Sequence, residues 1–262
     1  MSDGLTRLMA QAIDGLRVNA VAFGERDGRP VVEKRRRALR TALFPGGNLF
    51  LRLSGSRIHM FTSASAWVEH ELHCFALLHG PERACGPLDG GLFVERLPGR
   101  SLRELVIAGE LDAAAMTAAG RELRRAHQLH CDRCDGPWSH GDPHLGNVLY
   151  DAEGGRAWLI DFETRHDPGQ TAEARHADDL LVVLLELVGR CEAPGALAHA
   201  LLAGYGAGLA LEALRERLEV PRGLEAVLWS TRTHHMGRER LEGAVAELRG
   251  IVEGVGARGH AT

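Results

Sequence analysis

The order of strand-like and helix-like segments constrains this fold more than any other feature of the sequence. The first third of the chain contains short apolar runs separated by turn residues, whereas apolar residues recur at helical spacing from Ser101 onward. The break falls at Pro98-Gly99. Segregation of this kind predicts an α+β protein with a strand-rich lobe at residues 1–97 and a helical lobe at residues 98–262. A cleft between two such lobes is a common place for a ligand.

In the strand-rich part, turn residues and apolar spacing predict two β-turns and one helix. Asp27-Gly28 lies between two β-prone runs and is typical of a hairpin, and residues 88–97 are strand-like around a Gly-Gly turn. Residues 63–78 show helical spacing, with Ser63 or Ser65 as the cap. Residues 35–62 begin as a basic segment and continue into a Pro-Gly-Gly turn at 45–47, and residues 1–15 are predicted to form a short amphipathic helix.

The second part is predicted to be helical apart from one hairpin. The hairpin joins residues 147–150 to residues 157–160 through a turn that contains Gly154-Gly155. The predicted helices cover residues 101–108, 112–130, 173–190, 195–218 and 222–252.

Composition favours an ordinary globular protein and argues against several other classes. The chain has 262 residues, 45% of them hydrophobic and 25% charged, and its net charge of -4 is not that of a nucleic-acid binder. No apolar run reaches the roughly 18 residues that a membrane span needs. The N-terminus does not resemble a secretory signal, and the odd number of cysteines, 5, argues against a disulfide framework. A cytoplasmic protein is therefore expected.

The residues that carry chemistry cluster in one segment. The sequence SHGDPHLGN at residues 139–147, called the polar loop below, is followed one hairpin later by Ile160-Asp161-Phe162-Glu163. Phosphoryl transfer needs a group that orients the attacking hydroxyl and metal ions that neutralise phosphate charge. Asp142 is suited to the first task, and Asn147 and Asp161 offer the oxygen ligands that Mg²⁺ prefers.

These segments resemble the protein-kinase-like superfamily, in its aminoglycoside-phosphotransferase and lipopolysaccharide-kinase branch. SHGDPHLGNVLYD is similar to that branch's catalytic loop, and LIDFE is similar to its metal-binding segment. The resemblance implies a two-lobed kinase-like fold that binds ATP and Mg²⁺, with Asp142 as catalytic base and Asn147 and Asp161 as metal ligands. It covers most of residues 30–190.

The resemblance also implies roles for weaker matches elsewhere in the chain. LFVERLPGRSL is similar to the segment between lobes, where backbone groups of Glu95, Arg96 and Leu97 would bind adenine. Apart from the resemblance, His140 and His144 are expected to pack and hydrogen-bond within the polar loop rather than to ligate a metal. Residues 175–187 are similar to the helix in which an aspartate braces that loop, and Asp179 is preferred over Asp178. For either one, the alternative is an exposed carboxylate near the start of a helix, where it favours the helix dipole.

Lys34 is expected to grip the ATP phosphates, with Glu71 as its partner and Glu69 as the alternative. It is the only lysine of the chain, and a lysine suits a phosphate site as a mobile point charge. The basic run at residues 34–37 is otherwise a solvated face, or a surface that attracts an anionic substrate or a lipid membrane. About 35 residues separate Lys34 from Glu71, which is long for the family, so residues 35–62 are an insertion with its own structure or Lys34 is the wrong residue. The first strands also contain no G-x-G-x-x-G loop, which departs from the family.

The expected function is an ATP-dependent phosphotransferase that acts on a hydroxyl of a small molecule or of a glycolipid sugar. The short segment between Asp161 and the next helix favours such an acceptor over a peptide. The alternatives are an atypical Ser/Thr protein kinase and a pseudokinase that serves as a nucleotide-binding scaffold. A Cys-x-x-Cys pair at Cys131 and Cys134, with histidines nearby, also leaves open a zinc site.

Overall fold

The computed structural model describes residues 19–36, 44–134 and 136–259, which fall into two compact units. Unit 1 comprises Met1–Leu97 and Asp161–Asp167, and unit 2 comprises Pro98–Ile160 and Pro168–Thr262. Strands and helices occur together, which confirms the predicted α+β class. The predicted helix at 1–15 lies outside the described residues. Residues 161–167, assigned from the sequence to the helical part, belong to unit 1 because their strand pairs there.

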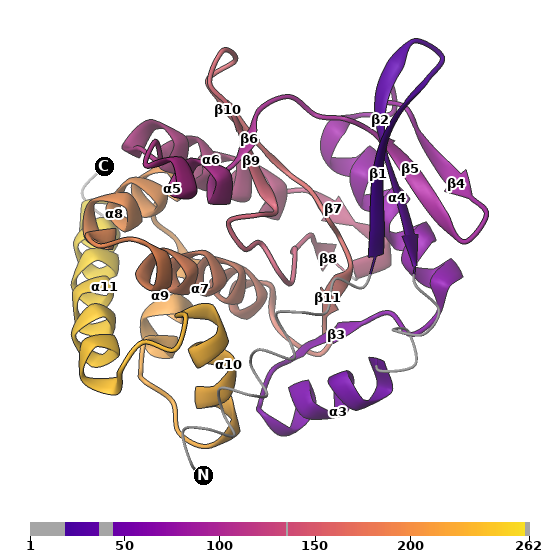
Figure 1. Cartoon of the computed structure of the whole chain (residues 1–262). Helices are drawn as coiled ribbons and strands as arrows, with labels where there is room; N and C mark the ends of the chain where they lie inside the picture. Colours follow the sequence, from indigo (N-terminus) through magenta and orange to yellow (C-terminus); the bar gives the residue numbers. More distant parts are fainter. Residues whose placement is uncertain (1–18, 37–43, 135, 260–262) are drawn as a thin grey trace. The chain divides into compact units, whose positions relative to one another are not determined.

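Unit 1 contains a four-stranded antiparallel sheet in the order β1-β2-β5-β4. Its first two strands form the long hairpin drawn in indigo in Figure 1, and the predicted turn is confirmed. Asp27 and Gly28 have φ values of 50° and 74°, the left-handed conformation that a tight two-residue turn requires. The strands are β1 (Asn19–Arg26), β2 (Arg29–Arg36), β4 (Cys85–Leu88) and β5 (Gly91–Glu95).

Helix α4 (Ala64–His79) packs against β4 and β5 and supplies much of the core of unit 1. Trp67, Phe75 and Leu78 are buried along it. The predicted cap is confirmed, since the Ser63 side chain accepts a hydrogen bond from the N–H of Ala66. The helix ends at Gly80, whose φ of 91° disfavours other residues.

The described part of the predicted insertion contains helix α3 (Phe44–Leu53) and strand β3 (Ile58–Met60). The turn predicted at 45–47 is wrong, because these residues form the start of α3, where a proline costs no hydrogen bond. Asn48 ties the helix to β3, since its side chain donates to the carbonyl of Met60 and accepts from the Met60 N–H. Strand β3 pairs with β11 (Thr164–His166), a pairing that the sequence did not predict.

Unit 2 is mainly helical, and the helices predicted before residue 190 are confirmed. The two longest predicted helices are wrong, since each is divided in two. Gly206 and Gly208 have φ values of 83° and 150° between α8 and α9, and His234 and His235 have positive φ between α10 and α11. The helices are α5 (Leu102–Ala108), α6 (Ala113–His127), α7 (Ala172–Arg190), α8 (Pro194–Tyr205), α9 (Leu209–Arg217), α10 (Leu224–Arg232) and α11 (Arg238–Gly259).

Helix α7 forms the centre of unit 2, with α9, α10 and α11 packed against it (Figure 1). Most of its side chains are buried, including Leu180, Leu184 and Leu187. None of the helices in the described part of the chain is long and apolar enough to cross a membrane.

The strands of unit 2 are short and surround the polar loop. The predicted hairpin is confirmed as β9 (Val148–Asp151) and β10 (Arg156–Leu159), and β6 (Arg100–Ser101) adds a third strand beside β9. A second pair, β7 (His130–Cys131) and β8 (Gly136–Pro137), precedes the loop. The polar loop therefore runs between two small β-structures that hold both of its ends.

Candidate functional site

One buried carboxylate of α7 braces the polar loop in unit 2. Asp179 is 0% exposed, and its two oxygens accept hydrogen bonds from the backbone N–H groups of His140 at 2.7 Å and Gly141 at 2.8 Å. The alternative residue, Asp178, instead pairs with Arg217 at 2.6 Å. Of the two aspartates, Asp179 is thus the one that bonds to the loop.

Histidines extend this bracing into the core of unit 2. His127 lies with its Nε2 3.0 Å from Asp179 Oδ2 and its Nδ1 2.9 Å from the Tyr205 hydroxyl. Its ring stacks on His176 with 3.9 Å between centroids. Burial, together with the neighbouring His127, lowers the pKa of His176 to about 3, so His176 is neutral at pH 7. Its Nε2 donates to the carbonyl of Trp138, one residue before the loop.

Asp142 lies in this loop and pairs with an arginine from a distant part of the chain. Arg232, the last residue of α10, donates from Nη2 to Asp142 Oδ1 at 2.5 Å. Burial alone would raise the pKa of Asp142, but the charges of Arg232, His144 and His140 outweigh it and the pKa is lowered. Asp142 is therefore an anion at neutral pH.

Asn147 is fixed at the end of the polar loop with one oxygen left to act as a ligand. It is 5% exposed, and its side-chain Nδ2 donates to the backbone carbonyl of Asp142 at 3.0 Å. The backbone carbonyl of Asn147 accepts a hydrogen bond from the N–H of Ile160 at 3.0 Å. Ile160 directly precedes Asp161 in the chain. Because the amide nitrogen is committed to the loop, the side-chain oxygen is the atom that could hold a cation.

A second buried carboxylate of α7, Glu186, was not predicted. It lies seven residues after Asp179, on the same helix face, and pairs with Arg190 at 3.1 Å and Arg103 at 3.6 Å. Arg103 also donates its backbone N–H to Leu145 of the polar loop at 2.9 Å. Glu186 thereby connects α7 to α5, the helix that bonds to the loop. The seven-residue spacing from Asp179 was the sequence signal that could have found it.

In unit 1, two predicted residues lie beside Lys34, the only lysine of the sequence. Lys34 Nζ lies 2.6 Å from Glu71 Oε1 and 2.6 Å from Asp161 Oδ1. The second oxygen of Glu71 accepts from the N–H of Phe162 at 2.9 Å, whereas the alternative Glu69 is exposed. Burial disfavours a charged lysine, yet Asp161 and Glu71 outweigh it and raise the pKa of Lys34. Lys34 is therefore a buried cation.

Glu163 adds a carboxyl group beside Asp161 that the sequence reading did not single out. Its side chain accepts a hydrogen bond from Asn19, the first residue of β1. Burial and the negative charge of Asp161 raise the pKa of Glu163 well above its ordinary value. Two adjacent carboxyl groups of this kind form an oxygen donor set that suits Mg²⁺, because a cation relieves their repulsion.

The segment predicted to bind adenine lies at the end of β5, and part of it is already hydrogen-bonded. The N–H of Glu95 donates to Ala84 at 2.6 Å, and the N–H of Arg96 donates to Pro30 at 2.8 Å. The Glu95 side chain pairs with two arginines of unit 1. Any adenine contact of this segment therefore has to use carbonyl oxygens or Leu97.

The cysteine pair considered for zinc shows no ligand cluster. Cys131 and Cys134 lie in and after β7 and form no disulfide. Within residues 19–36, 44–134 and 136–259, no group of three or more His, Cys, Asp or Glu side chains is arranged to hold a metal ion. A magnesium site in this chain would accordingly need phosphate or water oxygens beside the protein ligands.

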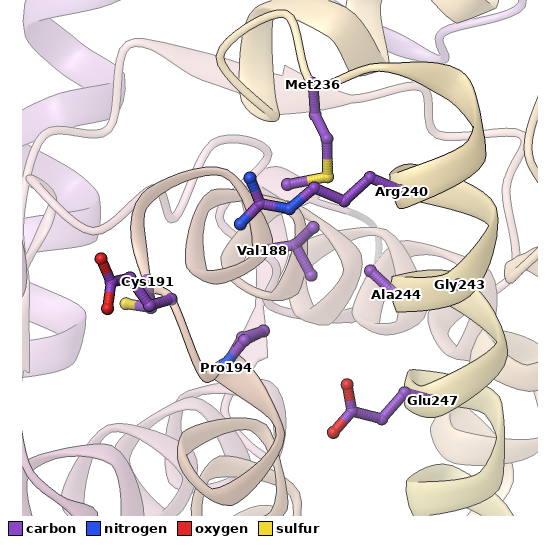
Figure 2. A pocket seen from close by; sticks show the side chains of 9 residues that line it. Val188, Cys191, Pro194, Met236, Arg240, Gly243, Ala244 and Glu247 are labelled. Atoms are coloured by element: carbon purple, nitrogen blue, oxygen red, sulfur yellow. The ribbon is translucent and has the colours of Figure 1, made fainter.

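A separate hollow of unit 2 lies between α7, α8 and α11 (Figure 2). Its volume is about 330 Å³, and Val188, Met236 and Arg240 are among its lining residues. None of the site residues predicted from the sequence lines it. The hollow is therefore distinct from the polar loop.

Comparison with protein-family models gives no match, and comparison with curated proteins gives none either. Among solved structures, the complex of Rv3197 with erythromycin from Mycobacterium tuberculosis is similar to this chain with a TM-score of 0.39. The identity is 14%, over 92% of this chain and 75% of the other. A similarity at this level carries no argument about function.

Proposed function

We propose that this chain is an ATP-dependent phosphotransferase of the protein-kinase-like fold. It transfers the γ-phosphoryl group of ATP to a hydroxyl of a small molecule or of a glycolipid sugar. The observation that supports this most is the contact of Lys34 with Glu71 and Asp161, at 2.6 Å in each case. These residues are far apart in the sequence, yet all three were expected from the sequence to serve one nucleotide site.

In the proposed reaction, unit 1 provides the groups that hold the nucleotide. Lys34 binds the phosphates as a point charge, and buried Glu71 keeps its side chain in place. Asp161, Glu163 and Asn147 would hold Mg²⁺. When bound, the cation supplies charge neutralisation for the phosphate oxygens.

Asp142 acts on the acceptor. Its carboxylate takes the proton of the acceptor hydroxyl, whose oxygen forms a bond to the γ-phosphorus. The bond from that phosphorus to the bridging oxygen breaks, and ADP leaves with the electron pair. The lowered pKa keeps Asp142 ionised over the neutral range, so its carboxylate can orient the hydroxyl and accept the proton as the bond to phosphorus forms.

Two features bear on the acceptor and the compartment. Helix α7 begins at Ala172, so little chain lies between Asp161 and that helix for binding a peptide. This favours a small molecule or glycolipid over a protein acceptor. None of the five cysteines, all within the described residues, forms a disulfide, which supports our proposal of a cytoplasmic location.

The proposal is tested by incubating the purified chain with γ-labelled ATP, Mg²⁺ and either a small-molecule and lipid extract or a mixture of cell proteins. Transfer to the extract is expected, and Asp142→Ala should lower it about 10³-fold or more while ATP still binds. Asp132→Asn, which changes an exposed aspartate of unit 2, is the matched control and should leave transfer unchanged.

Other outcomes point to the alternatives. Transfer to proteins alone would indicate an atypical protein kinase. ATP binding without turnover in the wild type would indicate a nucleotide-binding scaffold. Asp161→Asn should weaken ATP binding only when Mg²⁺ is present, and an ATP-induced thermal shift that ignores Mg²⁺ would contradict the metal site.

A further inference from the structure

The carboxylate of Asp142 is held from one side only. Arg232 Nη2 donates to Oδ1 at 2.5 Å, and among the described residues no hydrogen bond reaches Oδ2. Both side chains are about a quarter exposed, with 27% for Asp142 and 24% for Arg232. One oxygen is therefore occupied and the other is left to react.

Arg232 is itself firmly placed at the end of α10. The next residue, Thr233, is 1% exposed, and its hydroxyl donates to the carbonyl of Trp229 at 2.9 Å. Gly189 of α7 permits close packing here, because a Cβ at that position would lie only 2.7 Å from the Arg232 carbonyl oxygen. The backbone that carries the guanidinium is thus fixed on α7.

The other acids near Arg232 have arginine partners of their own. Glu186 and Asp178 of α7 both raise the pKa of Arg232 through their charge. Glu186, however, pairs with Arg190 at 3.1 Å, and Asp178 pairs with Arg217 at 2.6 Å. The direct hydrogen bond of Arg232 therefore goes to Asp142.

We propose that Arg232 is a positioning residue for the phosphoryl transfer. By fixing Oδ1, its guanidinium stops rotation of the Asp142 carboxylate and presents Oδ2 to the hydroxyl that gives up its proton. This inference rests on the proposed function and assigns α10 a part in the chemistry. A reacting group displaced by about 1 Å can lose about 10²-fold in rate, so a fixed carboxylate matters to the rate.

The test compares three variants in ADP formation from Mg·ATP, with water as the acceptor until the natural one is known. Arg232→Gln should lower kcat about 10²-fold and leave the KM for ATP within about twofold, since the nucleotide groups are untouched. Arg232→Lys keeps the charge, so its kcat should be about tenfold higher than that of Arg232→Gln. Arg217→Gln breaks the ion pair between Arg217 and Asp178 of α7, and it should leave kcat unchanged.

An unchanged kcat in Arg232→Gln, beside an active wild type, would overturn the inference and leave the proposed function intact. A wild type that forms no ADP would instead count against the proposed function. The pair is then tested without turnover, by urea unfolding of Asp142→Asn, Arg232→Gln and the double variant. Non-additive effects support the placement of Asp142 by Arg232, whereas additive effects overturn it.

Discussion

At the scale of single residues, unit 2 buries His176 in its neutral form next to the polar loop. His176 donates from Nε2 to the Trp138 carbonyl and stacks on His127, which contacts Asp179. Burial, together with the neighbouring ring of His127, disfavours a positive charge on His176. Protonation of His176 would place a charge inside the packed support of the polar loop, where burial disfavours it.

The stability of the protein should fall as the pH drops below 6.5. His176 has a pKa of about 3 in the folded chain and 6.5 in the unfolded chain, so between these values the unfolded chain binds more protons. His176 should cost about 2 kcal/mol of unfolding free energy between pH 6.5 and pH 5. Urea unfolding at several pH values measures this loss.

The variant His176→Gln should have a weaker pH dependence over this range, because the titrating ring is gone. His199→Gln, which changes an exposed histidine of α8, is the control for losing one imidazole. Equal pH dependence in His176→Gln and the wild type would show that His176 is not the group responsible.

Residues within a continuous motif could be predicted, and residues that tertiary packing brings to the site could not. Asp142, Asn147 and Asp161 lie in two neighbouring segments whose spacing is visible in the sequence. Arg232 is 90 residues from its partner Asp142, and nothing in its own neighbourhood marks it. Its role follows only from where α10 packs on α7.

At the scale of elements, helices α6 and α8 approach each other closely through glycines. A Cβ at Gly120 of α6 would lie 2.0 Å from the carbonyl oxygen of Leu201, and one at Gly204 of α8 would lie 2.3 Å from that of Thr117. Both obstacles are backbone atoms, which cannot turn aside as a side chain can. The close packing of α6 on α8 therefore requires glycine at both positions.

Replacing one of these glycines should separate the two helices. Gly120→Ala should destabilise the protein by about 1–3 kcal/mol or more, because the backbones have to shift. Gly250→Ala in α11 is the matched control: a Cβ there meets nothing within 4 Å, and alanine favours a helix by up to about 1 kcal/mol. Urea midpoints that move in the same direction for both variants would contradict this packing.

Prediction of elements succeeded where the periodic signal was long and failed where it was short or interrupted. Helices α4 and α7 have buried faces of several turns, so their spacing is plain in the sequence. Strands β3 and β11 have three residues each, too few for a period of two to be seen. The breaks after α8 and α10 depend on left-handed backbone at a few residues, which apolar spacing does not reveal.

At the scale of the whole molecule, the chain passes between the two units at three points. It leaves unit 1 after Leu97, returns at Asp161 and leaves again after Asp167. The returning segment is essential to unit 1, since Phe162 is 1% exposed, Asp161 pairs with Lys34 and β11 pairs with β3. Unit 1 is therefore not a contiguous stretch of sequence.

A polypeptide that ends at Leu97 should not form a stable unit 1. It lacks the partner strand of β3, the buried ring of Phe162 and one of the two carboxylates at Lys34. Far-UV circular dichroism should show no cooperative urea transition for it, whereas the full chain under the same conditions should show one. A sharp transition of this shorter polypeptide, at the midpoint of the full chain, would disprove the dependence on residues 161–167.

The late arrival of β11 has a consequence for biosynthesis. A ribosome adds about 5–20 residues per second, so on the order of ten seconds pass between the emergence of residue 97 and that of residue 167. During this interval Lys34 lacks the carboxylate of Asp161, and strand β3 lacks its partner β11. Chaperone contact at this stage would protect β3, because an unpaired strand edge is prone to aggregate.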